Sequence, residues 1–259
     1  MNTTTLTMDA PVVNRAQSTD HIFHRLNILR DRLYALIVHG NRCMIEDLLD
    51  EHVDVADLLL DYPLNKKLYP IHLACTLENI NIIELLLQRY HNVNATSFHD
   101  GWTPLHLACK FGCRHSMRLL IENGADVNAL DANHWTPLHV ACQFGKTDLM
   151  QLLLDSGANL SLSVKNKQHL TPESLYKTQF TQADPMMLTL LQFQQGLVCL
   201  MQNKMKQANT IFQHVSNEHP EWMSEWVRQV KENNTRSHMT VGDQDVFFAL
   251  PVINQYVSH

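Results

Sequence analysis

Two seven-residue segments of this chain are nearly identical and begin 33 residues apart, at Thr103 and Thr136. Both have the order Thr-Pro-Leu-His, an aliphatic residue, Ala and Cys. A third copy over residues 69–75 begins 34 residues before the first. A fixed period close to 33 residues is typical of helical hairpins stacked in a row, because no single hairpin buries enough surface to be stable alone. The period therefore predicts a repeat fold that exposes an extended binding surface.

Each copy carries the residues that begin and end a short helix. Thr103 and Thr136 can cap a helix, and the Pro that follows is favoured at the first helical position because its missing N–H costs nothing there. The His two residues after each Pro is placed to bond the start of one hairpin to the next. Gly112 and Gly145 fall where the first helix of each pair must end in a left-handed residue.

An apolar segment and then a polar segment follow each of these helix starts. The apolar segments predict second helices over residues 82–87, 117–121 and 149–154. The polar segments that begin at Gly124 and Gly157 end the second helix, and we expect each to turn the chain into a β-hairpin finger.

These motifs resemble the ankyrin-repeat family, whose pattern residues 103–135 and 136–168 match almost position by position. The copy at Tyr69 is weaker, because Tyr69 replaces the capping Thr, Glu78 replaces the mid-repeat Gly and Tyr90 replaces the terminal Gly. Loss of the cap alone costs about 0.5–2 kcal/mol. We therefore expect this repeat to depend on its neighbours.

Less regular repeats extend the same frame on both sides. Upstream, residues 33–36, Gly40 and residues 44–49 predict a degenerate first repeat with a long finger over residues 57–68. Downstream, residues 170–175 restart the pattern without the His. Outer repeats are irregular because they close a core that would otherwise face water. The resemblance implies about four repeats and a partial fifth over residues 20–184, after a disordered tail over residues 1–19.

The period ends at Pro185, where two further helices are expected over residues 186–199 and 205–215. The spacing of small, aromatic and proline residues in them is similar to that of a single tetratricopeptide repeat, and an unrelated helical hairpin is the alternative. The residues that carry this similarity are Gly196, Cys199, Ala208, Phe212 and Pro220. A capping helix over residues 221–231 would complete a helical segment at 185–232.

Residues 233–259 are expected to be a polar linker and an apolar tail. The tail at residues 246–252 either folds back onto the helices or serves as a docking peptide. The fold class expected for the whole chain is an all-α ankyrin-repeat solenoid with a C-terminal helical hairpin extension.

Composition and charge exclude several classes of protein. With 45% hydrophobic and 18% charged residues the chain is an ordinary globular sequence of one or two domains. A net charge of −6 argues against a protein that binds nucleic acid backbones. No apolar run reaches the roughly 18 residues of a membrane helix, and no secretory signal begins the chain. We expect a cytoplasmic, monomeric protein whose repeated cysteines, Cys75, Cys109 and Cys142, are reduced and buried.

No pattern in the chain points to catalysis, a cofactor or a metal. His and Cys recur three residues apart in the repeats, as in His106 and Cys109, but the family motif accounts for the His, and zinc needs four converging ligands. Cys113 and His115 have no third group to orient them for nucleophilic chemistry. We expect a protein that is not an enzyme and binds no cofactor or metal.

Ankyrin repeats bind partner proteins in a concave groove formed by the finger tips and first helices, and the resemblance assigns that role by position. Two aromatic pairs, Trp102 with Phe111 and Trp135 with Phe144, recur one repeat apart and are candidate hot spots. The alternative is that these rings pack between neighbouring fingers. The predicted partner-binding residues are Leu68, Leu77, Trp102, Lys110, Phe111, His134, Trp135, Gln143 and Phe144. The predicted rim, which either orients the partner or is merely solvated, is Lys66, Lys67, Asp100, Lys110, Asp131 and Lys165.

Asn94 and Asn128 each follow Val, precede Ala and have Leu eight residues earlier. They resemble ankyrin sites that are hydroxylated by the asparaginyl hydroxylase of the hypoxia pathway. The structural alternative is a turn-forming Asn.

The function that fits these observations is a non-catalytic adaptor or scaffold for a partner protein. One alternative is an ankyrin effector that an intracellular bacterium or virus delivers into the host cytosol. A second is the substrate-selecting part of an enzyme, although roughly 50 residues after the repeats are few for an independent catalytic domain. The fold alone does not identify the partner.

Overall fold

The computed structural model of the protein describes residues 13–61, 63–64, 68–89, 92–97, 100–180, 183–225 and 228. These residues are mostly helical and contain no strand beyond an isolated bridge between Leu64 and Leu68. The chain divides into two compact units, residues 1–92 and 93–259. The all-α fold class predicted from the repeats is confirmed.

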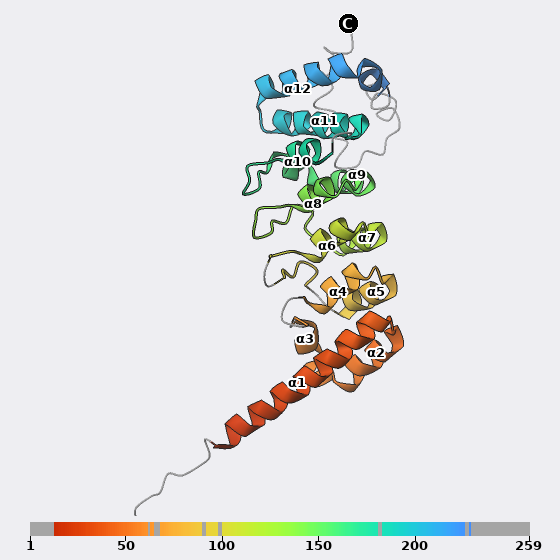
Figure 1. The fold of residues 1–259 in the computed structure, drawn as a ribbon, viewed down its shortest axis with the longest axis vertical. Coiled ribbons are helices and arrows are strands. Elements are labelled where there is room, and N and C mark those ends of the chain that lie inside the picture. The colour runs from red at the N-terminus through yellow and green to blue at the C-terminus, as the bar shows by residue number, and fades with distance from the viewer. Residues whose placement is uncertain are drawn as a thin grey trace, which may run out of the picture. The chain divides into compact units, whose positions relative to one another are not determined.

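The first unit contains five labelled helices, drawn from red to orange in Figure 1. Helix α1 packs against α2, α3 and α4, and α5 pairs with α4 and also touches α2. The core between them is aliphatic, with Leu33, Ile45, Leu59, Ile71 and Ile83 buried. The helices are α1 (Val13–His39), α2 (Arg42–Glu51), α3 (Val53–Asp61), α4 (Pro70–Thr76) and α5 (Ile80–Arg89).

Two predictions for the first unit are wrong. We expected a disordered tail over residues 1–19, but residues 13–19 belong to α1, and residues 1–12 lie outside the described residues. No Gly or Pro interrupts residues 13–39, so nothing in this segment breaks the helix. We also expected a long finger over residues 57–68, where the chain forms helix α3 instead. Val55, Leu59 and Leu60 are buried at helical spacing, and their burial favours a helix over a loop.

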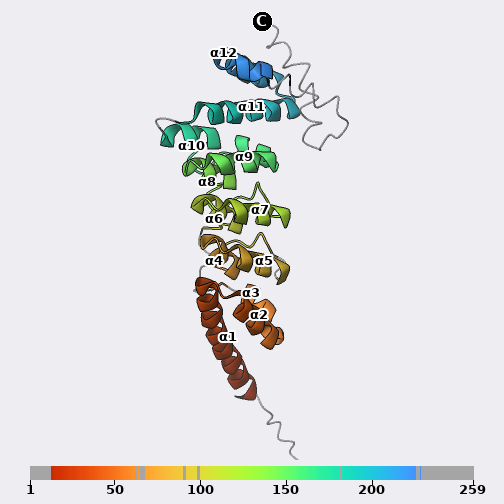
Figure 2. The ribbon, with the colours of Figure 1, turned by 90° about the vertical axis from the view of Figure 1, so that its right-hand side faces the viewer.

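In the second unit, successive helices stack in chain order (Figures 1 and 2). Helix α8 packs between α6 and α10, while α7 and α9 each pair with the first helix of their own repeat. The 3-10 helix η1 packs against α8, α9, α10 and α11. The elements are α6 (Pro104–Phe111), α7 (Arg114–Glu122), α8 (Pro137–Gln143), α9 (Thr147–Asp155), η1 (Ala158–Ser163), α10 (Pro172–Gln179), α11 (Pro185–Met201) and α12 (Met205–Glu218).

Two buried histidines hold consecutive repeats of this unit together. His106 Nδ1 accepts the backbone N–H of Thr103 at 3.2 Å, so the ring proton is on Nε2, which donates to the carbonyl of Trp135 at 3.0 Å. His139 repeats the arrangement, accepting from the Thr136 N–H and donating to the carbonyl of Leu170 at 3.2 Å. The predicted bond from the start of one hairpin to the next is therefore confirmed.

The fingers differ from the predicted β-hairpins. We call residues 131–135 finger 2 and residues 166–170 finger 3, and residues 100–102 belong to finger 1. Finger 2 closes through two backbone bonds, from Asp131 N–H to the Trp135 carbonyl at 2.9 Å and from His134 N–H to the Asp131 carbonyl at 3.0 Å. It joins finger 1 through the Ala132 N–H, which donates to the Asp100 carbonyl at 2.9 Å. Finger 3 has the same two bonds, and among the described residues neither turn continues into a ladder, so the fingers are tight turns rather than strands.

Helices α11 and α12 form the expected C-terminal hairpin and pack closely at a glycine. A Cβ added to Gly196 would lie 2.7 Å from Cε1 of Phe212, so only glycine permits this approach. Phe193 packs against both Phe212 and Trp222, which closes a small aromatic core. Residues 220–225 are helical, and the rest of the predicted capping helix, except residue 228, and the tail at 233–259 lie outside the described residues.

None of the helices in the described part of the chain is long and apolar enough to cross a membrane.

Substitution of Glu78 by Gly should stabilise the first unit. Glu78 is exposed and has φ of 52°, the left-handed conformation that glycine adopts freely. Relief of about 1–2 kcal/mol of backbone strain exceeds the about 0.4–1 kcal/mol lost through a freer unfolded chain. Urea unfolding should therefore show a gain of about 0.5 kcal/mol. The reverse exchange, Gly112→Glu at φ of 84°, should destabilise the second unit, and equal effects of the two exchanges would contradict this account.

Stability of the second unit should fall as the pH drops from about 6.5 to about 4. Burial lowers the pKa of His106, and it lowers the pKa of His139 to about 4. In that interval the unfolded chain binds protons that the folded histidines do not, so acid favours unfolding. Urea unfolding at a series of pH values measures the slope. His139→Asn should reduce it, whereas His134→Asn at an exposed finger tip should not; identical slopes for both variants would refute the prediction.

A candidate partner-binding groove in the second unit

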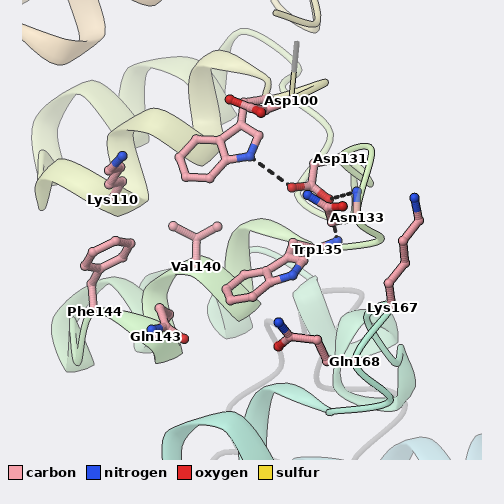
Figure 3. Close-up of a pocket in the computed structure, with 11 residues that line it drawn as sticks. Asp100, Lys110, Asp131, Asn133, Trp135, Val140, Gln143, Phe144, Lys167 and Gln168 are labelled. Carbon is pink, nitrogen blue, oxygen red and sulfur yellow. Dashed lines mark hydrogen bonds between the residues drawn. The ribbon is translucent and has the colours of Figure 1, made fainter. Parts of the chain in front are cut away.

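The second unit has a cavity of about 530 Å³ between its fingers and the first helices of two repeats (Figure 3). Fingers 1, 2 and 3 supply one wall, and helices α6 and α8 with the turn after α8 supply the other. Its lining residues are Asp100, Trp102, Lys110, Asp131, Asn133, Trp135, Val140, Gln143, Phe144, Lys167 and Gln168. Of the predicted partner-binding residues, the cavity brings together Trp102, Lys110, Trp135, Gln143 and Phe144.

Asp131 organises the cavity wall and is not the rim residue that we expected. Only 6% of its surface is exposed. Its Oδ1 accepts the backbone N–H groups of Asn133 and Trp135, both at 2.7 Å, and its Oδ2 accepts the indole N–H of Trp102 at 2.9 Å. A carboxylate that accepts three hydrogen bonds can be buried, and here it joins finger 2 to the tryptophan of finger 1.

Trp102 and Trp135 are half-buried, and both are held by hydrogen bonds and ring contacts within the repeats. The Trp102 backbone N–H donates to Ser97 Oγ at 3.0 Å, and its indole N–H is held by Asp131. Each indole also packs against the His of its own repeat, with ring centroids about 6 Å apart. Both residues nevertheless line the cavity, and their role as binding hot spots stays a prediction.

Phe111 and Phe144 are the exposed aromatic residues of this surface, with 50% and 42% of their area accessible. Phe144 lines the cavity, as Figure 3 shows. The ammonium group of Lys110 lies 5.1 Å from the Trp102 ring and 5.7 Å from the Phe111 ring, within the range of a cation–π interaction. This arrangement joins apolar area to positive charge beside the cavity.

The other predicted binding residues lie outside this cavity. His134 is exposed at the tip of finger 2 with φ of 60°. Leu77 is exposed and Leu68 is half-buried in the first unit, where Leu68 forms its bridge to Leu64. Among the predicted rim residues, Lys165 is exposed and does not line the cavity, and residues 66 and 67 lie outside the described residues.

Sequence analysis missed Asn133, Val140, Lys167 and Gln168 as lining residues. The repeat itself carried the missing signal, because Lys167 and Gln168 follow Asn166 as Ala132 and Asn133 follow Asp131. Residues 166–168 of finger 3 are thus equivalent to residues 131–133 of finger 2. The prediction considered only the residues next to each Thr-Pro pair.

Asn94 and Asn128 each bridge two consecutive repeats. Asn94 Oδ1 accepts the Asp126 N–H at 2.8 Å and its amide donates to the Gly124 carbonyl at 3.2 Å. Asn128 Oδ1 accepts from both the N–H and the hydroxyl of Ser161. Both side chains therefore have a structural role between repeats, and hydroxylation of these residues stays a prediction.

Within the described residues no group of three or more His, Cys, Asp or Glu side chains is placed to hold a metal ion. The two cysteines Cys109 and Cys142 are buried thiols, and burial raises the pKa of each well above its ordinary value. Buried neutral thiols act as small apolar side chains. All six cysteines of the chain lie in its described part and are free of disulfide bonds.

A family model described as ankyrin repeats in three copies matches residues 33–131 and 91–164, together more than half of the chain. The chain belongs to the ankyrin-repeat family. The match covers helices α2 to α9 and thus all of the regular Thr-Pro hairpins. Ankyrin repeats are generally non-catalytic, protein-binding modules, and all residues that line the cavity except Lys167 and Gln168 lie within the match.

Curated proteins similar to this ankyrin-repeat chain come from different organisms. An ankyrin repeat protein of Acanthamoeba polyphaga mimivirus is 29% identical over 99 residues, 38% of this chain and 12% of that protein. A tyrosine-protein kinase of Hydra vulgaris is 37% identical over 116 residues, 43% of this chain and 14% of the kinase. Protein phosphatase 1 regulatory subunit 12A of Mus musculus is 34% identical over 61 residues, 24% of this chain and 6% of the subunit. The chain therefore matches only a small part of each relative.

Asp131→Asn should destabilise the second unit by about 1–3 kcal/mol. The new amide would direct an N–H group at the Trp102 indole N–H, so a hydrogen bond would be lost and two donors would meet. Urea unfolding measures the loss. Asp100→Asn is the control, because Asp100 is exposed at the tip of finger 1. A loss no larger than in this control would show that Asp131 does not organise the fingers.

Proposed function

We propose that this ankyrin-repeat protein is a non-catalytic adaptor that binds a partner protein in the groove of its second unit. The observation that carries the proposal is the pair of exposed phenylalanines, Phe111 and Phe144, beside a cavity that two half-buried indoles line. Large aromatic side chains that lose their contact with water on binding supply much of the binding energy of protein interfaces.

The construction of the groove supports recognition of a protein rather than chemistry. Its indoles are positioned by backbone and side-chain hydrogen bonds, so little conformational freedom is lost when a partner binds. Burial raises the pKa of the Cys109 and Cys142 thiols, which keeps both of them neutral. The similarity to a kinase and to a phosphatase regulatory subunit lies in a small part of each protein, and it fits a shared module.

Several finer expectations remain predictions. The monomeric state and a cytoplasmic location follow from the sequence argument alone. The effector alternative also stays open, since the similar proteins include one from a virus and others from animals. The alternative of a substrate-selecting part of an enzyme fits the small share of each relative that the chain matches.

Simultaneous substitution of Phe111 and Phe144 by Ala should abolish partner capture without unfolding the protein. Both rings are exposed, so their removal should change the free energy of unfolding little, whereas loss of two hot spots of about 2 kcal/mol each weakens binding by several hundredfold. The measurement is affinity purification from the native cell with the intact chain and the variant as baits, followed by mass spectrometry.

Leu160→Ala is the matched control for this experiment, because Leu160 is 61% exposed in η1 and does not line the cavity. Circular dichroism of all three baits should be the same. Partners that the double variant still captures in full would place the interface elsewhere and refute the proposal.

A further inference from the structure

Fingers 2 and 3 have the same turn but differ in one side-chain atom of the residue that holds it. In finger 3, Asn166 is 2% exposed and its Oδ1 accepts the N–H groups of Gln168 and Leu170 at 2.9 and 3.0 Å. Asp131 makes the same two bonds in finger 2. The remaining side-chain atom is an acceptor in Asp131 and a donor, Nδ2, in Asn166.

This difference leaves two donors without an acceptor. Asp131 Oδ2 holds the Trp102 indole, whereas Asn166 Nδ2 is buried and has no partner among the described residues. The amide cannot be turned over, because its NH₂ group would then meet two backbone N–H groups. The Trp135 indole N–H also bonds to nothing in the described part of the chain. Unlike Asn166 Nδ2, it is not buried, so it reaches solvent at the cavity wall.

The surroundings of Trp135 determine which acceptor fits. In Figure 3 its indole nitrogen lies on the side of Lys167 and Gln168, and Phe144 lies across the same cavity. Lys167 is exposed and forms none of the ion pairs found among the described residues. A carboxylate oxygen there would accept the indole N–H, pair with the Lys167 ammonium and lie in the field of the unpaired Asn166 amide.

We propose that the groove binds an extended protein segment in which an Asp or Glu side chain accepts from Trp135 Nε1 and pairs with Lys167. A neighbouring large apolar side chain of the segment packs on Phe144. The inference rests on the proposed function and adds the chemistry of the partner. Asn166 is a positioning residue, because it offers the Trp135 indole N–H no acceptor and so leaves that N–H for the ligand. Asp131, by contrast, already accepts the indole N–H of Trp102.

The test uses the full chain, immobilised, to select from a phage-displayed library of random 12-residue peptides. Peptides with an acidic residue at a fixed spacing from a large apolar residue should be enriched. One selected peptide is then synthesised with Glu and with Gln at the acidic position, and fluorescence polarisation should show about tenfold weaker binding of the Gln form.

Two variants separate the role of the indole N–H from that of its ring. Trp135→Phe keeps an aromatic ring and removes the donor, and Asn166→Asp supplies an internal acceptor as Asp131 does. Each should bring the affinities for the Glu and Gln peptides within about twofold of each other. Asn166→Asp should also raise the thermal unfolding midpoint, which shows that a loss of binding is not a loss of fold. Trp222→Phe, in the C-terminal hairpin, is the control and should keep the tenfold preference.

Three outcomes would overturn the inference. They are selected peptides without an acidic residue, a Glu preference that survives in Asn166→Asp, and selection of no peptide at all. The proposed function is tested separately by the Phe111 and Phe144 double variant, so groove binding without acid preference would leave that function standing.

Discussion

The second unit depends on buried neutral histidines that bond in two directions at once. His106 accepts from the start of its own helix and donates to a carbonyl of the next finger, and His139 does the same one repeat later. Such a ring works only when it carries one proton, on Nε2, and burial keeps it in that state. Each repeat is thereby fixed to its neighbour by a bond that neither repeat can form alone.

Trp135, whose carbonyl accepts the bond from His106, also positions the groove. Trp135 presents its carbonyl to His106, its N–H to Asp131 and its ring to the cavity, so the interaction that joins repeats also sets the binding surface. Backbone geometry is then nearly constant from finger to finger, and recognition depends on side-chain differences between equivalent positions. One such difference is that finger 3 has Asn166 where finger 2 has Asp131. The turn is the same, but a side-chain acceptor is replaced by a donor.

Prediction from sequence succeeded where a local motif was complete and failed where only part of it remained. Thr136, Pro137 and Gly145 are sufficient to begin and end α8, because capping and left-handed glycine are local effects. Helices α1 and α3 lack these signals. Residues 13–19 belong to α1, where no Gly or Pro interrupts the helix, and burial of Val55, Leu59 and Leu60 favoured helix α3 where a finger was expected. In the groove, the aromatic residues were found by position, but Lys167 and Gln168 were missed because the loop order was not compared repeat by repeat.

The amino-acid sequence by itself determined the family, the period and the first helices of the regular repeats, because these depend on residues within one turn of each other. It also placed the four aromatic rings on one side of the stack. Only the tertiary structure decided that Asp131 is a buried connector rather than a rim charge, and that the indoles of Trp102 and Trp135 differ in hydrogen bonding. The physical reason is that hydrogen-bond partners about 30 residues apart meet only after the repeats have packed.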